Sequence, residues 1–376
     1  MQNSRIGFRV DAMVKGAHVM GYMESDFLGN NPTNVGVSSN SNTLRSRLYW
    51  VDVQRDKWEF LAGQTWSLIT PGRTGISPLP GNIFFTQDID VNYQAGLVWG
   101  RIPELRLVLR PTDKWAVAVA VDSPEQYIGG SAGAPTVTLP TNLSGLAGTQ
   151  LNDQTSTLKT PNPAPDFIAK VAYDPSSKLH VEAGGMVRDF KVWNSLPFPA
   201  GTSFSKIGAG GFVNLNVELF KNFRLLTNNF WADGGGRYIF GQVPDLIVRA
   251  DNTISPIKAA STASGFEYTH RSSLLYAYYG GIYVYRNLAF DSNGLTPIGY
   301  GLPNSSTQNR NIQEYTVGFN QTFWKDGKYG ALNLMGQFSY LSRNPWATLD
   351  PSDAHLNMAF LNLRYTLPGS TPTLGK

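Results

Sequence analysis

The sequence predicts an all-β fold in which one antiparallel sheet curls into a large barrel, and three features support this prediction. Segments of about ten residues that alternate between apolar and polar side chains recur along the whole 376-residue chain. Such alternation is typical of strands with one apolar face. Short turns and long polar loops alternate between these segments, and charged residues make up only 15% of the chain.

The alternating segments are expected to pair as hairpins, because turns of two to four residues join many neighbouring members. The first hairpin turns at Lys15-Gly16 and a later one at Asp326-Gly327. In segments 102–111 and 114–122, leucines and valines alternate with arginines and small alanines. In chain order, the predicted strands are 5–14, 17–27, 43–53, 57–66, 102–111, 114–122, 166–174, 178–190, 211–220, 223–232, 266–271, 273–285, 311–324, 328–341 and 355–367.

Long stretches rich in Gly, Ser, Asn, Thr and Pro separate the hairpins. These stretches are 28–42, 67–92, 123–165, 191–208, 233–264, 286–310 and 342–354. A compact soluble domain rarely contains so many loops longer than about 12–15 residues. Short turns at one end and long loops at the other are typical of an outer-membrane barrel. Nothing in the composition marks a domain boundary, so residues 1–376 are expected to form one domain.

The two faces of the predicted strands differ in polarity. Apolar positions such as Leu44, Leu48 and Trp50 are expected to face lipid, while charged and amide side chains of the opposite parity face a water-filled lumen. So many buried charges could not find partners in the core of a soluble barrel. No apolar run approaches the roughly 20 residues of a membrane helix. The candidates for aromatic girdles are Trp58, Trp66, Trp231, Trp324, Tyr340 and Tyr365. For each of them taken singly, ordinary packing is the favoured alternative.

The number of predicted strands is odd. Fifteen segments alternate in direction, so the first and the last would run parallel to each other. Because bacterial single-chain barrels have even strand numbers, we expect one further strand to precede Met1, which gives sixteen strands. A sixteen-stranded barrel leaves an aqueous channel.

Several blocks resemble the conserved blocks of the DcaP-like outer-membrane porins: GYMESDFLG (21–29), LRSRLYWVDV (44–53), WEFLAGQTWSLITP (58–71), RIPELRL (101–107) and DSPEQYIGG (122–130). The similarity covers roughly the first third of the chain, and later strands match mainly in pattern. It implies a sixteen-stranded homotrimer in the outer membrane of a Gram-negative bacterium, with a strand preceding the segment RIGFRVDA. It also implies passive uptake of small anionic solutes such as dicarboxylates.

An arginine-biased lumen is the candidate functional feature. The arginines on the lumen parity are Arg9, Arg45, Arg47, Arg106, Arg110 and Arg188. Guanidinium groups stay charged and can bind carboxylates with two hydrogen bonds. Glu24 and Asp26 share the lumen parity and are expected to oppose the arginines, which would create a transverse field. In the alternative reading, the arginines pair with lumen acids and brace the wall.

The loop 66–91 is the candidate constriction, because it is too apolar for a purely exposed loop. Folded inward, it would narrow the pore and bring Arg73 and Asp88 near the eyelet. The alternative is a surface loop or a contact between subunits.

Other function classes find little support. The chain contains no cysteine, only four histidines without metal-ligand spacing, and no GxSxG motif. A net charge of +4 is too small to indicate a nucleic-acid partner. We therefore expect no enzyme activity, no metal and no cofactor. A plugged, structural or adhesive outer-membrane barrel without channel activity is the alternative to a porin.

Overall fold

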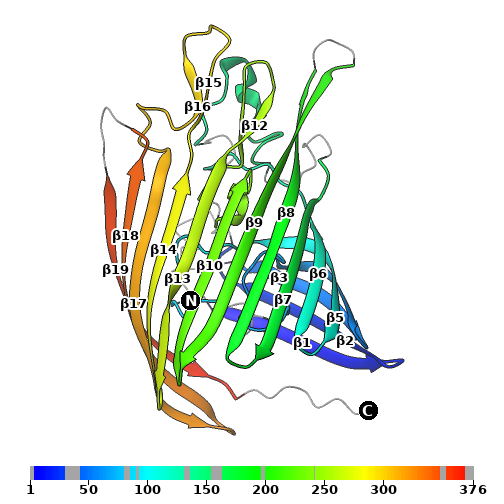
Figure 1. Ribbon diagram of the computed structural model, residues 1–376, viewed down its shortest axis with the longest axis vertical. Coiled ribbons are helices and arrows are strands. Elements are labelled where there is room, and N and C mark those ends of the chain that lie inside the picture. Colours follow the sequence, from blue (N-terminus) through cyan, green and yellow to red (C-terminus); the bar gives the residue numbers. More distant parts are fainter. Residues whose placement is uncertain are drawn as a thin grey trace.

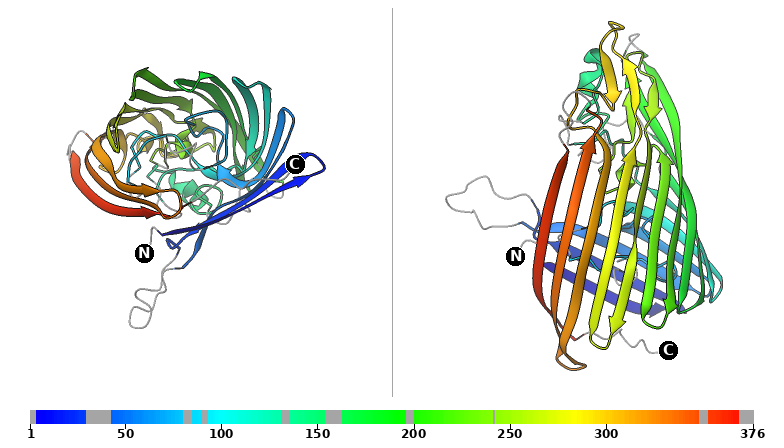
Figure 2. Two further views of the ribbon diagram at one scale, coloured as in Figure 1. Left: turned by 90° about the horizontal axis from the view of Figure 1, so that it is seen from below. Right: turned by 60° about the vertical axis from the view of Figure 1, so that its left-hand side comes forward.

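A computed structural model describes residues 4–29, 43–79, 85–89, 93–130, 136–153, 163–195, 200–240, 242–347 and 353–368. Within these residues, fifteen strands form one antiparallel sheet whose spatial order follows the order of the chain. The sheet curls into a tall barrel wall with β1 and β19 at its two edges (Figures 1 and 2). The predicted all-β barrel fold is therefore confirmed.

All fifteen strands of this sheet coincide with predicted segments. They are β1 (Arg5–Val14), β2 (Ala17–Asp26), β3 (Arg45–Arg55), β4 (Trp58–Trp66), β5 (Arg101–Thr112), β6 (Trp115–Asp122), β7 (Asp166–Ser176), β8 (Leu179–Asn194), β9 (Thr202–Phe220), β10 (Phe223–Asp233), β13 (Lys258–His270), β14 (Ser273–Val284), β17 (Asn309–Asp326), β18 (Gly330–Pro345) and β19 (Ala354–Thr366). The strands β9 and β13 begin about eight residues earlier than predicted, within stretches that we expected to be loops.

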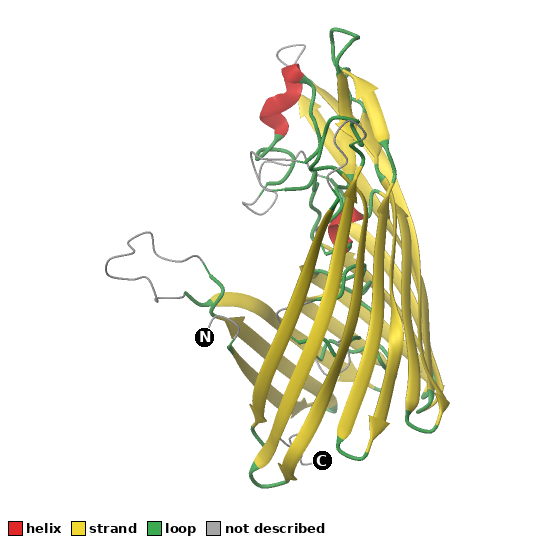
Figure 3. Cartoon of the chain, turned by 90° about the vertical axis from the view of Figure 1, so that its left-hand side faces the viewer, coloured by secondary structure: helices red, strands yellow, loops and turns green. Residues whose placement is uncertain are grey.

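Smaller elements lie at the end of the barrel that carries the long loops and in the interior below it, where Figure 3 shows one of the two short helices. The hairpins β11 (Leu246–Val248) with β12 (Ile254–Pro256) and β15 (Asn287–Phe290) with β16 (Pro297–Tyr300) form two separate small sheets. The short helices are η1 (Thr141–Leu146) and η2 (Gly236–Tyr238). Within the described residues, no helix is both long and apolar enough to cross a membrane.

The first hairpin shows why its turn can be so tight. Lys15 and Gly16 both have positive φ angles, 49° and 81°. Two-residue turns of this kind match the twist of the strands that they join, and glycine adopts a positive φ without a steric penalty. The turn therefore fixes the register between β1 and β2, in which Val14 pairs with Ala17.

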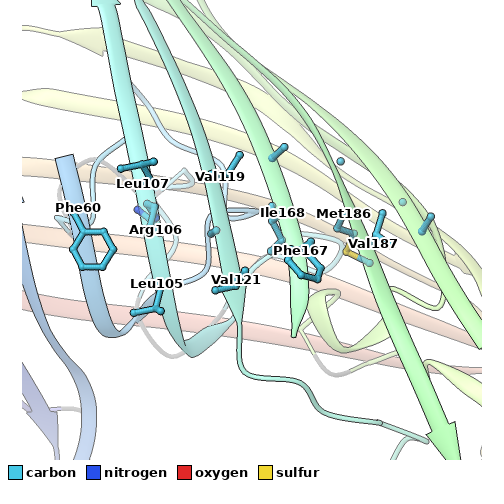
Figure 4. A pocket seen from close by; sticks show the side chains of 15 residues that line it. Phe60, Leu105, Arg106, Leu107, Val119, Val121, Phe167, Ile168, Met186 and Val187 are labelled. Carbon is cyan, nitrogen blue, oxygen red and sulfur yellow. The ribbon is translucent and has the colours of Figure 1, made fainter. Parts of the chain in front are cut away.

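The hairpin of β5 and β6 has the predicted division of faces. Leu105 and Leu107 are exposed on the outward face, whereas Ala118 and Ala120 on the inward face are buried. Figure 4 shows how the outward side chains of neighbouring strands line one apolar hollow, which includes Phe167. Small alanines on the inward face leave room for chain segments inside the barrel.

The prediction that Leu48 and Trp50 face lipid is wrong. Their side chains are 0% and 3% exposed and belong to an apolar cluster on the inward face with Met20 and Leu61. The cause is a β-bulge: Glu24 pairs with Leu48 but Ser25 pairs with Ser46, so Arg47 is an additional residue in β3. A bulge of one residue reverses the parity of the strand beyond it.

Trp66 is not part of an outer girdle: its side chain is 4% exposed and packs in an apolar cluster inside the barrel, as the alternative of ordinary packing predicts. The other five girdle candidates, Trp58, Trp231, Trp324, Tyr340 and Tyr365, have exposed side chains.

An apolar core lies between the inward face of the wall and the segments that fold into the barrel, which the end-on view in Figure 2 shows inside the ring. Leu246 and Ile247 of β11 and Tyr238 of η2 belong to the same buried cluster as Phe190 and Val192 of β8. Burial of apolar surface thus holds these segments inside the barrel.

Candidate functional site

The chain between β4 and β5 folds into the interior of the barrel. The Gly72 N–H donates to the carboxylate of Glu182 on β8 (3.1 Å), and the Gly75 N–H donates to Asp174 on β7 (3.0 Å). Further along, the Ile89 N–H donates to Gln337 on β18 (2.8 Å). These partners lie on distant strands, so the described part of loop 66–91 runs along much of the inner wall. Residues 80–84 and 90–91 lie outside the described residues.

Cations of the inner wall hold the first part of this loop in place. Arg106 donates to the Trp66 carbonyl oxygen (2.6 Å), Lys170 to that of Thr70 (2.7 Å) and Arg110 to that of Ile76 (2.8 Å). The buried side chains of Leu68, Ile69 and Ile76 join the apolar core. The apolar composition of the loop is thus explained by burial inside the barrel.

The loop residues Arg73 and Asp88 do not form an ion pair with each other. Arg73 forms an ion pair with Glu267 on β13 and donates to the Phe85 carbonyl oxygen (2.6 Å). Burial alone would lower the pKa of Arg73, but the ion pair with Glu267 outweighs it and raises this pKa above its usual value. The two residues therefore have different surroundings, and their expected position near an eyelet stays a prediction.

Asp88 has surroundings that disfavour its ionised form. Burial is the largest cause and raises the pKa of the Asp88 carboxyl well above its usual range. The negative charges of Glu314 and Glu267 act in the same direction. A carboxyl group in such surroundings keeps its proton at pH values where an exposed aspartate is ionised.

Each of the six predicted pore arginines faces a carboxylate. The pairs are Arg9 with Asp11 (2.7 Å), Arg45 with Asp26 (2.7 Å), Arg47 with Glu24 (2.6 Å) and Asp26 (2.8 Å), Arg106 with Glu104 (2.5 Å), Arg110 with Glu59 (2.5 Å), and Arg188 with Asp166 (2.9 Å) and Asp245 (2.7 Å). These ion pairs are compatible with arginines that brace the wall, and contact of the same arginines with a solute stays a prediction.

Glu24 and Asp26, which we expected to oppose the arginines across the lumen, contact two of them directly, and a transverse field stays a prediction. Both carboxylates lie directly beside Arg47, and Asp26 also accepts from Arg45. The bulge at Arg47 turns its side chain toward Glu24 on the neighbouring strand. A close pair of opposite charges has a much smaller field across a pore than two charges on opposite walls.

Acidic side chains on the inner wall are more numerous than we predicted from the sequence, where we expected arginines to exceed acids. The following are buried: Asp52, Glu59, Glu104, Asp122, Asp166, Glu182, Glu267 and Glu314. The expected surplus of arginines over acids is therefore absent from the described part of the inner wall. Alternation alone would have identified several of these acids, because Glu104 precedes Arg106 by two residues and Glu182 follows His180 by two.

A buried polar network around Arg188 joins the wall to the inner segments. Arg188 donates to the carbonyl oxygens of Gly234 (2.7 Å) and Glu125 (2.6 Å). The hydroxyl of Tyr238 lies 3.0 Å from the Asp122 carboxylate and 2.9 Å from that of Asp166. Arg188 therefore positions the segment between β10 and η2 and the segment that follows β6, and it contacts protein groups on several sides.

Sequence reasoning did not identify three further cations of the interior. Lys170 pairs with Glu182 (3.1 Å), and His180 contacts Asp174 (2.8 Å) and Glu182 (3.3 Å). Both follow the inward parity of β7 and β8, so alternation could have found them. The third, Arg101, lies at the start of β5 over the rings of Trp66 and Trp99, each 5.8 Å from the guanidinium carbon. Alternation gave no signal for it.

Comparison with known proteins gives a likeness of fold. No protein-family model and no curated protein matches the chain. OmpT of Vibrio cholerae, expressed in the outer membrane, is 12% identical over 96% of this chain and 89% of that chain, with a TM-score of 0.51. An anion-selective porin from Comamonas acidovorans is 12% identical over 96% and 87% (TM-score 0.48). OprB of Pseudomonas putida is 12% identical over 95% and 87% (TM-score 0.49).

The likeness to OmpT extends over nearly the whole chain and agrees with the sheet topology described above. The chain therefore has the fold of an outer-membrane β-barrel.

The segment around Ala95, in the chain between β4 and β5, packs against the wall, and this contact can be tested at Gly280 on β14. A Cβ atom at Gly280 would clash with the Ala95 carbonyl oxygen, whereas a Cβ at Gly21 would meet no atom within 4 Å. We expect Gly280→Ala to lower the free energy of unfolding by about 1–3 kcal/mol, the usual cost of overpacking. The matched control Gly21→Ala should change it by less than about 0.5 kcal/mol. Equal stability of the two variants in denaturant titrations would contradict the docking of this segment.

The surroundings of Asp88 predict a pH-dependent stability. Because its pKa is raised in the folded protein, ionisation costs stability as the pH rises above the unfolded value of about 3.9. Asp88→Asn removes that cost, so the variant should gain stability over the wild type at pH 8 and not at pH 3.5. Denaturant titrations at both pH values measure the difference. A gain of the same size at pH 3.5 would show that Asp88 is not the titrating group.

Proposed function

We propose that this protein is an outer-membrane porin, through which small hydrophilic solutes diffuse passively. The observation that carries the proposal is the division of one continuous sheet into an apolar outward face and a charged inward face. Exposed side chains such as Val10, Val213 and Leu361 extend this apolar face from β1 to β19. Soluble monomers rarely expose contiguous apolar patches of more than a few hundred Å², so lipid is the solvent that fits the outer face.

The finer parts of the proposal concern location, assembly and selectivity. A Gram-negative outer membrane and a homotrimer are supported by the fold and by the resemblance to DcaP-like porins. Preference for small anions such as dicarboxylates is supported by that resemblance. Because the six inner arginines face carboxylates, we expect the selectivity to depend on inner cations that lack an acidic neighbour.

A barrel closed by its own inner segments is the second candidate. It is favoured by the apolar core in which β11, η2 and the loop 66–76 pack against the inward faces of β5–β8. In that case the barrel has a structural or adhesive role and conducts no solute. The two candidates share the same fold and differ in whether a continuous water path remains.

Single-channel recording distinguishes the two candidates. The refolded protein, inserted into a planar bilayer, should give steps of conductance, and a trimer should close in three correlated steps. Under a KCl gradient, the reversal potential should show a preference for chloride. A folded barrel with heat-modifiable electrophoretic mobility and no conductance would refute the porin and leave the closed barrel.

Contact of the outward face with lipid can be tested at Leu107. Leu107→Arg places a charge on this face and should lower the free energy of unfolding in lipid vesicles by about 2–4 kcal/mol if the site lies near the bilayer midplane. Asp113→Arg, in the short turn between β5 and β6, introduces the same side chain at the end of the barrel. This control should change the stability by less than about 0.5 kcal/mol. Similar values for both variants would show that lipid does not cover β5.

A further inference from the structure

Arg101 differs from the six inner arginines discussed above. None of the ion pairs of the inner wall includes it, and its buried Nε atom has no hydrogen-bond partner among the described residues. The side chain is only partly buried. A guanidinium group in such a position keeps unused donors, and buried donors without partners are unfavourable.

Aromatic rings form the surroundings of Arg101. Its guanidinium carbon lies 5.8 Å from the ring centres of both Trp66 and Trp99, which are 5.2 Å from each other. Tyr93 and Phe240 continue this aromatic wall, at 5.3 Å and 4.9 Å from Trp99. Trp99 also contacts two apolar clusters on the inward face, so the wall lies inside the barrel.

Among the described residues around Arg101, three arginines (Arg45, Arg47 and Arg101 itself) face two carboxylates, those of Glu24 and Asp26. The charges of Arg45 and Arg47 repel that of Arg101, and each does so more strongly than the Asp26 carboxylate attracts it. Arg5 donates to the Tyr93 hydroxyl (3.5 Å). The carboxylates of Glu24 and Asp26 accept hydrogen bonds from Arg45 and Arg47. Neither carboxylate forms a hydrogen bond with Arg101. An anion would therefore reduce the repulsion between these arginines.

We propose that Arg101 and the partly exposed ring of Trp99 form a binding site for a solute carboxylate that carries a planar aromatic group. The guanidinium fork matches the two oxygens of a carboxylate. The Trp66 ring is buried, whereas the Trp99 ring is only partly buried and provides a flat apolar surface against which an aromatic solute can stack. This inference rests on the proposed function, because the solute reaches the site through the lumen.

The experiment uses benzoate as the probe and acetate as a carboxylate without a ring. Binding to the folded barrel is measured by calorimetry, and block of conductance is measured in planar bilayers. Arg101→Gln should raise the dissociation constant of benzoate about tenfold, which equals about 1.4 kcal/mol. Arg101→Lys keeps the charge without the fork and should give an intermediate value. Arg55→Gln removes the same charge from an exposed position near the β3–β4 turn and should bind as the wild type does.

The outcomes separate this inference from the proposed function. If the wild type conducts and Arg101→Gln binds benzoate as tightly as the wild type, the porin stands and the binding site is refuted. If benzoate binds in an Arg101-dependent way without conductance, the site stands and the porin is refuted. Equal affinity for acetate and benzoate would refute the role of the Trp99 ring. Heat-modifiable mobility confirms folding of each variant before the measurements.

Discussion

The hydrogen-bonded ladder of the sheet is the constraint on which the rest of this structure depends. A strand that crosses lipid must have every backbone N–H and C=O group satisfied by its neighbours. The ladder in turn fixes the alternation of side chains, with apolar residues such as Leu105 outward and Glu104 or Arg106 inward. The composition of the interior therefore follows from the requirements of the outer surface.

An interior built in this way contains many ionisable groups close together. Their arrangement is determined by the free-energy cost of burying a charge without an oppositely charged partner. Arg188 and Asp166 are both fully buried, and removal of either partner from such a pair is strongly destabilising. The same groups also anchor backbone carbonyls of the inner segments, as Arg106 does with Trp66. Arginines predicted from the sequence to bind solute thus form ion pairs within the wall and hydrogen bonds to the inner segments.

Alternation predicted the strands and most of their faces, because period two is set by the backbone and needs no knowledge of partners. It failed at Leu48 and Trp50, since the bulge at Arg47 leaves no signal in a local pattern. It also could not show which acid faces Arg47, because Glu24 lies on another strand. Arg101 was missed because it begins a strand, where contacts with Trp66 and Trp99 determine its position and parity does not. The apolar residues of loop 66–91 indicated that this loop folds inward. They could not indicate which residues of β7, β8 and β18 it contacts.

The density of ion pairs has a consequence for selectivity. The six inner arginines Arg9, Arg45, Arg47, Arg106, Arg110 and Arg188 each lie 2.5–2.9 Å from a carboxylate. These pairs act as short dipoles whose field decays over a few ångströms. A solute in the lumen then interacts mainly with charged groups that are not part of such ion pairs. Arg101 is such a group, and the rings beside it exclude water from one side of its charge. A porin of this design would select solutes through a local contact and would leave the mean charge of its lumen close to neutral.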